Sequence, residues 1–129
     1  MLDIFYNNKS IGINSGLLEI LLRISALQVH EPPPAIGEKI RNDWLFISSG
    51  HHGEILSPDF DGYMKNDEGR SIALQAIGDA VRLLKDGPPL IDHNLINLLW
   101  QTERFSTPIV AEAVVAAGEK LLNFVSAES

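Results

Sequence analysis

The sequence predicts a mainly α-helical protein with one domain, and three observations support this fold class. Apolar residues recur at helical spacing through most of the chain. Proline, glycine and capping residues separate these stretches at intervals typical of helix boundaries. The length of 129 residues suits one domain with its own core. We therefore expect a single helical domain over residues 1–129, with about five helices in antiparallel pairs.

The first 14 residues alternate weakly between apolar and polar positions. Ile4 and Tyr6 precede a polar stretch at residues 7–10, and Ile11 and Ile13 follow it. Asparagine, present twice in this stretch, tolerates the left-handed backbone of a tight hairpin turn. A short β-hairpin or an extended arm is expected here, and a frayed terminus is the alternative.

Two helices are expected next, separated by the prolines at positions 32–34. The first runs from Ser15 or Gly16 to Val29, with Asn14 or Ser15 as its cap. Its apolar residues surround nearly the whole circumference, which indicates that neighbours cover it on several sides. The second helix carries an apolar face with steps of four, four and three residues, made of Ile36, Ile40, Trp44 and Ile47.

Residues 50–69 form the least regular segment, because they are rich in glycine, aspartate and proline. A 20-residue irregular stretch is uncommon in a compact domain and is often functional. We expect an irregular excursion here, with room for one short helix or hairpin.

Three further helices are expected in the second half of the chain. The first covers residues 71–85, and Gly87 after it suits a left-handed position that ends a helix. The second begins after Asp92, and the third begins after Ser106 or Thr107. The apolar face of the second of these helices consists of Leu95, Leu98, Leu99 and Thr102.

Three similar six-residue stretches lie 41 and 40 residues apart, at residues 35–40, 76–81 and 116–121. This period is in the range of HEAT-like helix pairs. Each stretch contains a glycine in mid-helix, which suggests close backbone packing there. Chance similarity between common residues is the alternative, and the helices then pack without a repeat.

The net charge of −7 and the absence of cysteine limit the classes of function. Only ten lysines and arginines are present, scattered singly, so nucleic acids and anionic membranes are disfavoured as partners. A chain without cysteine has no disulfide or thiolate site and suits the cytoplasm, and the first residues lack a signal-peptide pattern. No cofactor is expected, because no phosphate-binding glycine motif occurs.

The first candidate site is the acidic part of the irregular segment. Between positions 54 and 68 five carboxylates stand against one lysine, and aromatic residues lie among them. Aromatic anchors combined with a steering charge are common in binding surfaces. The expected partner-binding residues are Glu54, Asp59, Phe60, Asp61, Tyr63, Asp67 and Glu68. The alternative is a solvated loop whose aromatic rings pack back onto the core.

A second candidate is a metal site built on His51, His52 and Glu54, which are metal-capable residues within four positions. Adjacent histidines point in different directions on regular structure, so a third ligand from elsewhere is needed. The spacing of known zinc motifs is absent, and an EF-hand beginning at Asp59 fails at several positions. These residues are therefore weak candidates, and a polar loop is the favoured interpretation.

The leading hypothesis is a non-catalytic binding protein whose acidic surface engages and neutralises a basic partner protein such as a toxin. In size and charge the chain resembles the immunity proteins that block toxic bacterial nucleases. The resemblance implies that carboxylates would pair with the cationic residues that the partner uses for phosphates. A helical adaptor that binds through a groove is the first alternative, and a small metal-dependent hydrolase using His51 and His52 is the second. A homodimer also remains open.

Overall fold

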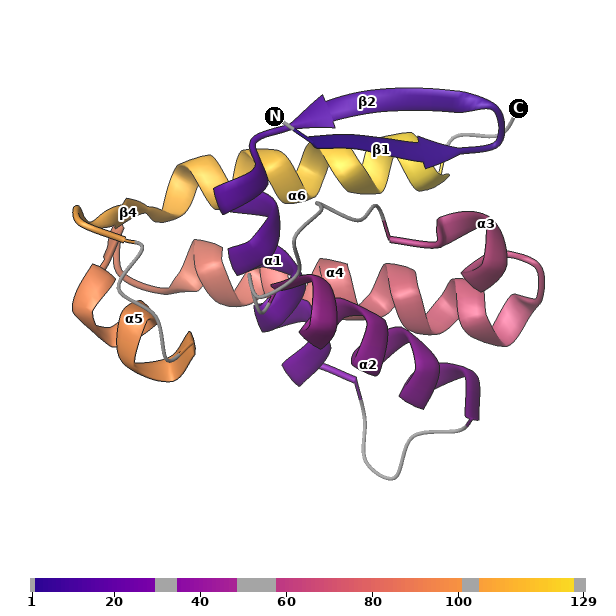
Figure 1. The fold of residues 1–129 in the computed structure, drawn as a ribbon, viewed down its shortest axis with the longest axis horizontal. Helices are drawn as coiled ribbons and strands as arrows, with labels where there is room; N and C mark the ends of the chain where they lie inside the picture. The colour runs from indigo at the N-terminus through magenta and orange to yellow at the C-terminus, as the bar shows by residue number, and fades with distance from the viewer. Residues whose placement is uncertain (1, 30–34, 49–57, 101–104, 127–129) are drawn as a thin grey trace.

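The computed structural model describes residues 2–29, 35–48, 58–100 and 105–126. Within these ranges the chain forms six helices and two small antiparallel sheets (Figure 1). The predicted mainly α-helical fold is therefore confirmed. No helix in these ranges combines the length and the apolar character needed to cross a membrane.

The chain begins with a β-hairpin of β1 (Leu2–Tyr6) and β2 (Lys9–Ile13), which pair antiparallel. The two residues between the strands, Asn7 and Asn8, have φ values of 55° and 64°. Two consecutive left-handed residues in a two-residue loop are typical of a type I′ turn, whose twist matches that of the strands. The expected hairpin is present, and its asparagines occupy the turn for the reason that the sequence suggests.

The hairpin lies along the C-terminal helix α6 (Ala111–Ser126), as Figure 1 shows. The ring of Tyr6 meets the ring of Phe124 edge-on, with 6.3 Å between centroids. The Lys120 ammonium donates a hydrogen bond to the Gly12 carbonyl oxygen at 2.8 Å. Both strands are thus attached to the last helix of the described chain.

The helix α1 (Ser15–Leu27) packs against α2 (Ala35–Ser48), the long helix α4 (Asp67–Asp86) and α6. The Asn14 side chain accepts a hydrogen bond from the Leu17 amide at 3.2 Å and caps α1 as expected. Contact with three helices explains why apolar residues surround α1. The fully buried large side chains of α1 are Leu18, Ile20, Leu21 and Leu22.

Helical structure reaches further into residues 50–69 than the sequence suggests. A one-turn helix, α3 (Phe60–Tyr63), precedes α4, and α4 begins at Asp67 rather than near Ser71. The Asn66 side chain caps α4 by accepting a hydrogen bond from the Gly69 amide at 2.6 Å. Because α4 begins four residues earlier than expected, the last part of the irregular segment is helical.

The chain after α4 differs from the prediction in two respects, the conformation of Gly87 and the start of the last helix. Gly87 has φ −92° and ψ −174°, which is extended and not left-handed. Residues 109–110 form β4 (Ile109–Val110), which pairs with β3 (Leu90–Ile91). Pairing in this small sheet occupies the backbone that a helix beginning after Thr107 would need, so α6 starts at Ala111. The helix between the two strands, α5 (His93–Trp100), follows Asp92 as predicted.

The packing of α6 differs from that of a HEAT-like repeat. In the repeat α6 would pair with α5, but its main helical neighbours are α4 and α1. A side chain at Gly118 would place its Cβ 2.6 Å from a Val81 methyl, which fits the expected close packing. At Gly78 the space is open, so the corresponding glycine does not share that role.

Candidate functional site

The acidic segment is divided between the interior and the surface. Phe60 and Tyr63, expected to be exposed aromatic anchors, are fully buried. Asp59, Asp61, Asp67 and Glu68 are exposed, and Glu54 lies outside the described residues. The expectation that Phe60 and Tyr63 are exposed anchors is therefore wrong, and partner binding by the exposed carboxylates stays a prediction.

Local structure explains why the two rings turn inward. The Asp59 side chain accepts a hydrogen bond from the Gly62 amide at 3.1 Å and starts the single turn of α3. This turn directs Phe60 and Tyr63 toward the core, where their rings meet edge-on with 5.5 Å between centroids. Tyr63 also packs edge-on against Trp44 at 6.1 Å. The aromatic residues of this segment thus help to hold α3 against α2.

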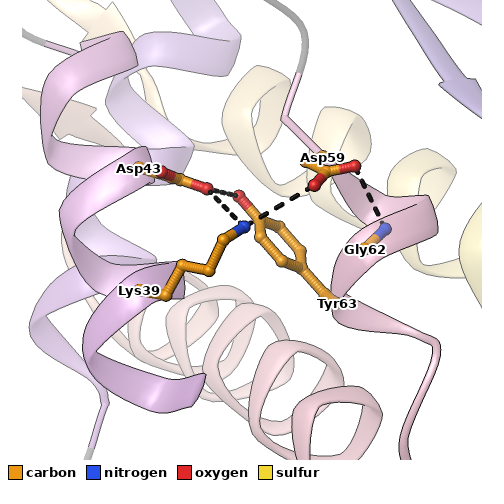
Figure 2. A network of polar contacts seen from close by, with 5 residues as sticks. All are labelled: Lys39, Asp43, Asp59, Gly62 and Tyr63. Carbon is orange, nitrogen blue, oxygen red and sulfur yellow. Dashed lines mark hydrogen bonds and ion pairs between the residues drawn. The ribbon is translucent and has the colours of Figure 1, made fainter. Parts of the chain in front are cut away.

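A polar network joins α2 to α3 around the hydroxyl of Tyr63 (Figure 2). This hydroxyl donates to a carboxylate oxygen of Asp43 at 2.9 Å. Lys39 lies 3.5 Å from the Asp43 carboxylate and 3.6 Å from that of Asp59. Its ammonium is also 5.2 Å from the centre of the Tyr63 ring. One lysine thus balances the two carboxylates that flank the buried phenol.

The phenol of Tyr63 is held in its neutral form. Burial and the nearby negative charge of Asp43 raise the pKa of Tyr63 far above its ordinary value. A phenol that keeps its proton donates the hydrogen bond to Asp43 at all ordinary pH values. The network therefore resembles a structural link between two helices more than an acid–base site, which requires a pKa near the working pH.

The remaining carboxylates of the segment fall into two groups. Asp61 accepts a hydrogen bond from the Asn7 amide at 2.9 Å and so fastens the tip of the hairpin to α3. Asp67 and Glu68, in the first turn of α4, are exposed, and neither has an ion pair within the described ranges. Two of the four described acids therefore serve the fold, and two remain open to a partner.

An apolar groove lies elsewhere, between α1, the end of α4 and the start of α5. Its volume is about 490 Å³, and its lining is almost wholly apolar. The leucines that line it while being more than half exposed are Leu27, Leu83, Leu90 and Leu95. The remaining lining residues are Ile20, Ile24, Leu84, Gly87, Pro88, Ile91, Asp92 and Ile96. This groove collects four of the eight exposed large hydrophobic residues of the described chain.

The charged residues around the groove differ in whether they are already paired. Arg82 is paired with Asp79 in the same helix, and the Lys85 ammonium lies 3.7 Å from the Glu119 carboxylate of α6. The carboxylates of Asp86 and Asp92 have no cationic partner among the described residues. The Asp92 carboxylate accepts a hydrogen bond from the Asn94 amide at 2.9 Å, at the start of α5. The groove therefore has an apolar floor and unneutralised acids at its rim.

The sequence offered binding through a groove as an alternative, but it did not predict which residues line the groove, although one signal was present. Leu83 lies off the apolar stripe of α4, whose buried positions include Ala76, Ile77 and Ala80. A large residue off such a stripe has to be covered by another element or left open to solvent. On α5 the expected core face is wrong for Leu95 and Leu98, which are exposed, whereas Ile96, outside that face, is buried. The side chain of Leu99 and all of Thr102 lie outside the described residues.

The candidate metal ligands His51, His52 and Glu54 lie outside the described residues. Within the described part of the chain no cluster of three or more histidine, aspartate or glutamate residues is arranged to hold a metal ion. The hydrolase alternative stays a prediction, and elemental analysis of protein purified without a histidine tag tests it.

Comparison with protein-family models, curated proteins and solved structures found no match to this chain. The geometry and the charge of the described residues are therefore the basis for the function proposed next.

Proposed function

We propose that this protein is a non-catalytic binding module that holds a partner protein in the apolar groove between α1, α4 and α5. The observation that carries the proposal is the gathering of four half-exposed leucines around one concave surface. Soluble monomers seldom leave a contiguous apolar patch open unless it is used for binding. The adaptor alternative thus has more support than a loop with aromatic anchors.

The net charge gives this module a preference among partners. At −7 the chain attracts basic proteins and repels acidic ones over the Debye length, which is about 8 Å at physiological salt. Such steering raises the rate of association, whereas the desolvated apolar contact supplies most of the affinity. The proposal therefore keeps the basic partner of the leading sequence hypothesis. It assigns the main contact to the groove instead of the acidic segment.

Site-specific photocrosslinking in the producing cell tests the proposal. A photoreactive amino acid at Leu83 or Leu95 is expected to capture the same protein, identified by mass spectrometry. The matched control carries the photoreactive residue at Leu98, on the same helix as Leu95 but not in the groove lining. Absence of a protein adduct at both groove positions, or an equal yield at Leu98, would rule out the groove as the binding surface.

A second candidate function keeps the acidic surface as the contact, with the protein acting as an inhibitor of a basic toxin. The carboxylates of Asp67 and Glu68 support it, because they are exposed and form no ion pair with the described part of the chain. Under this candidate the double variant Asp67→Asn/Glu68→Gln loses partner binding, whereas Leu83→Ser retains it. The opposite pattern is expected if the groove is the binding surface.

A further inference from the structure

The occupant of the groove can be specified further from the chemistry of its lining and its rim, and this step rests on the proposed function. We propose that the groove binds one amphipathic α-helix of the partner, with its apolar face on the leucines and lysines or arginines at its flanks.

The apolar lining favours a helix over an extended segment. A bound strand would present free backbone N–H and C=O groups to a surface made almost entirely of leucine, isoleucine and proline side chains. Unpaired backbone groups that are removed from water cost free energy comparable to a lost hydrogen bond. A helix satisfies its own backbone and exposes only side chains, so it avoids this cost.

The dimensions also fit one helix. A groove of about 490 Å³ accepts several aliphatic side chains but not a folded domain. Anchors at positions i, i+4 and i+7 of a helix extend over about 11 Å along its axis, at 1.5 Å per residue. Such a row of anchors can reach all three elements that line the groove, of which α1 and α4 supply helical walls.

The rim sets the charge of the occupant. Asp92 belongs to the lining, and Asp86 is the last residue of α4, next to the lining residue Gly87. Neither carboxylate is paired with a cation of the described residues, whereas Arg82 and Lys85 nearby are paired within the chain. An incoming lysine or arginine therefore meets acids that are free to pair, and an incoming glutamate meets uncompensated repulsion. A second copy of this chain, itself at −7, is disfavoured for the same reason.

A designed peptide of 16 residues tests the occupant directly. It carries leucines at i, i+4, i+7 and i+11 with lysines on both flanks, and its affinity for the full chain is measured by fluorescence anisotropy. One control peptide replaces the lysines with glutamates, and a second places proline in the centre. We expect each control to bind at least tenfold more weakly at low salt than the lysine peptide.

Matched variants of the protein locate the contact. The double variant Asp86→Asn/Asp92→Asn is expected to bind the lysine peptide about fivefold more weakly, or weaker still, because asparagine preserves the cap of α5 but not the charge. Asp67→Asn/Glu68→Gln changes the net charge equally and is expected to have less than a twofold effect. Leu95→Ser is expected to weaken binding at least tenfold, whereas Leu98→Ser has little effect. Thermal unfolding of each variant checks that it is folded.

Several results would overturn the inference. These are tighter binding of the proline peptide, equal binding of the lysine and glutamate peptides, or equal effects of the two charge variants. A dimer of the chain alone that Leu83→Ser dissociates, detected by analytical ultracentrifugation, would assign the groove to a second copy. If a partner crosslinks at Leu83 but any of these peptide results is obtained, the proposed function as a binding module is retained. Only the proposal that the occupant is a basic helix is then rejected.

Discussion

The helices α3 and α5 carry large nonpolar side chains in opposite environments. In α3, Phe60 and Tyr63 are fully buried, although exposed acids lie beside them. In α5, Leu95 and Leu98 are 51% and 74% exposed. The two helices differ in what covers them. The helix α3 is held by the Asp59 cap, the ion pair between Lys39 and Asp59, and the hydrogen bond from the hairpin tip. The helix α5, by contrast, contributes Leu95 to the open groove. Neighbouring elements, more than local composition, determine whether a nonpolar side chain is buried.

The largest expected effect on stability concerns the buried aromatic rings of α3. Phe60→Ala removes a fully buried ring and leaves a cavity, so the free energy of unfolding should fall by about 3–5 kcal/mol. Urea denaturation measures it. A loss below about 1 kcal/mol would mean that the ring of Phe60 is not part of the core and would restore it as a surface anchor.

The hydroxyl of Tyr63 should have a smaller effect that depends on pH. At pH 7, Tyr63→Phe removes the hydrogen bond to Asp43 and should cost about 1 kcal/mol. Because the pKa of Tyr63 is raised in the folded state, its stabilising contribution is complete below about pH 10. Above that pH the unfolded chain loses the proton first, and stability should fall by up to about 1.4 kcal/mol per pH unit.

This pH dependence gives the tyrosine prediction its control. Tyr63→Phe lacks the titrating group, so the difference between the two proteins should disappear near about pH 11 and then reverse. Unfolding curves collected between pH 7 and pH 11.5 measure the difference. A constant difference across this range would show that the phenol is not held neutral by the fold.

The link between α3 and the hairpin should contribute less. Asp61→Ala removes the acceptor for the Asn7 amide, and this exposed hydrogen bond should be worth about 0.5–1 kcal/mol. Hydrogen exchange at Asn7 should accelerate about two- to fivefold, which corresponds to that free energy. Unchanged exchange at Asn7 would indicate that water replaces the carboxylate without cost.

The smallest expected effect on stability concerns the exposed leucines of α5. Leu98→Ser replaces a side chain that is mostly in water, so the free energy of unfolding should change by no more than about 0.5 kcal/mol. The same urea assay used for Phe60 measures this change. A loss above about 2 kcal/mol would show that α5 is covered in solution and would remove the contrast between the two helices.

The sequence predicted those elements whose signals lie in residues close together in the chain. The asparagine turn of the hairpin, the Asn14 cap and the start of α5 after Asp92 depend on residues close together in the chain, and each is present. The late start of α6 was missed, because the pairing of β3 with β4 depends on residues 18 and 20 positions apart. Short strands of two residues have no periodicity that a sequence pattern can reveal.

The site was predicted less well than the fold, for a related reason. Acids and aromatics in one segment indicated a docking surface, but the one-turn helix α3 separates them by directing the rings inward. The groove is built from α1, α4 and α5, and its existence depends on how these helices are placed relative to one another. Leucines at helical spacing therefore gave no information on which of them would remain uncovered.

The attachment of the hairpin has a consequence for assembly during synthesis. Its tip bonds to Asp61, 54 residues later in the chain, and its second strand bonds to Lys120, 108 residues after Gly12. At about 5–20 residues per second, a ribosome needs roughly 5–20 s to make the lysine that secures Gly12. The first two strands therefore emerge early but complete their attachment late, and Ile4 and Ile13, buried in the folded protein, wait for that cover in the meantime.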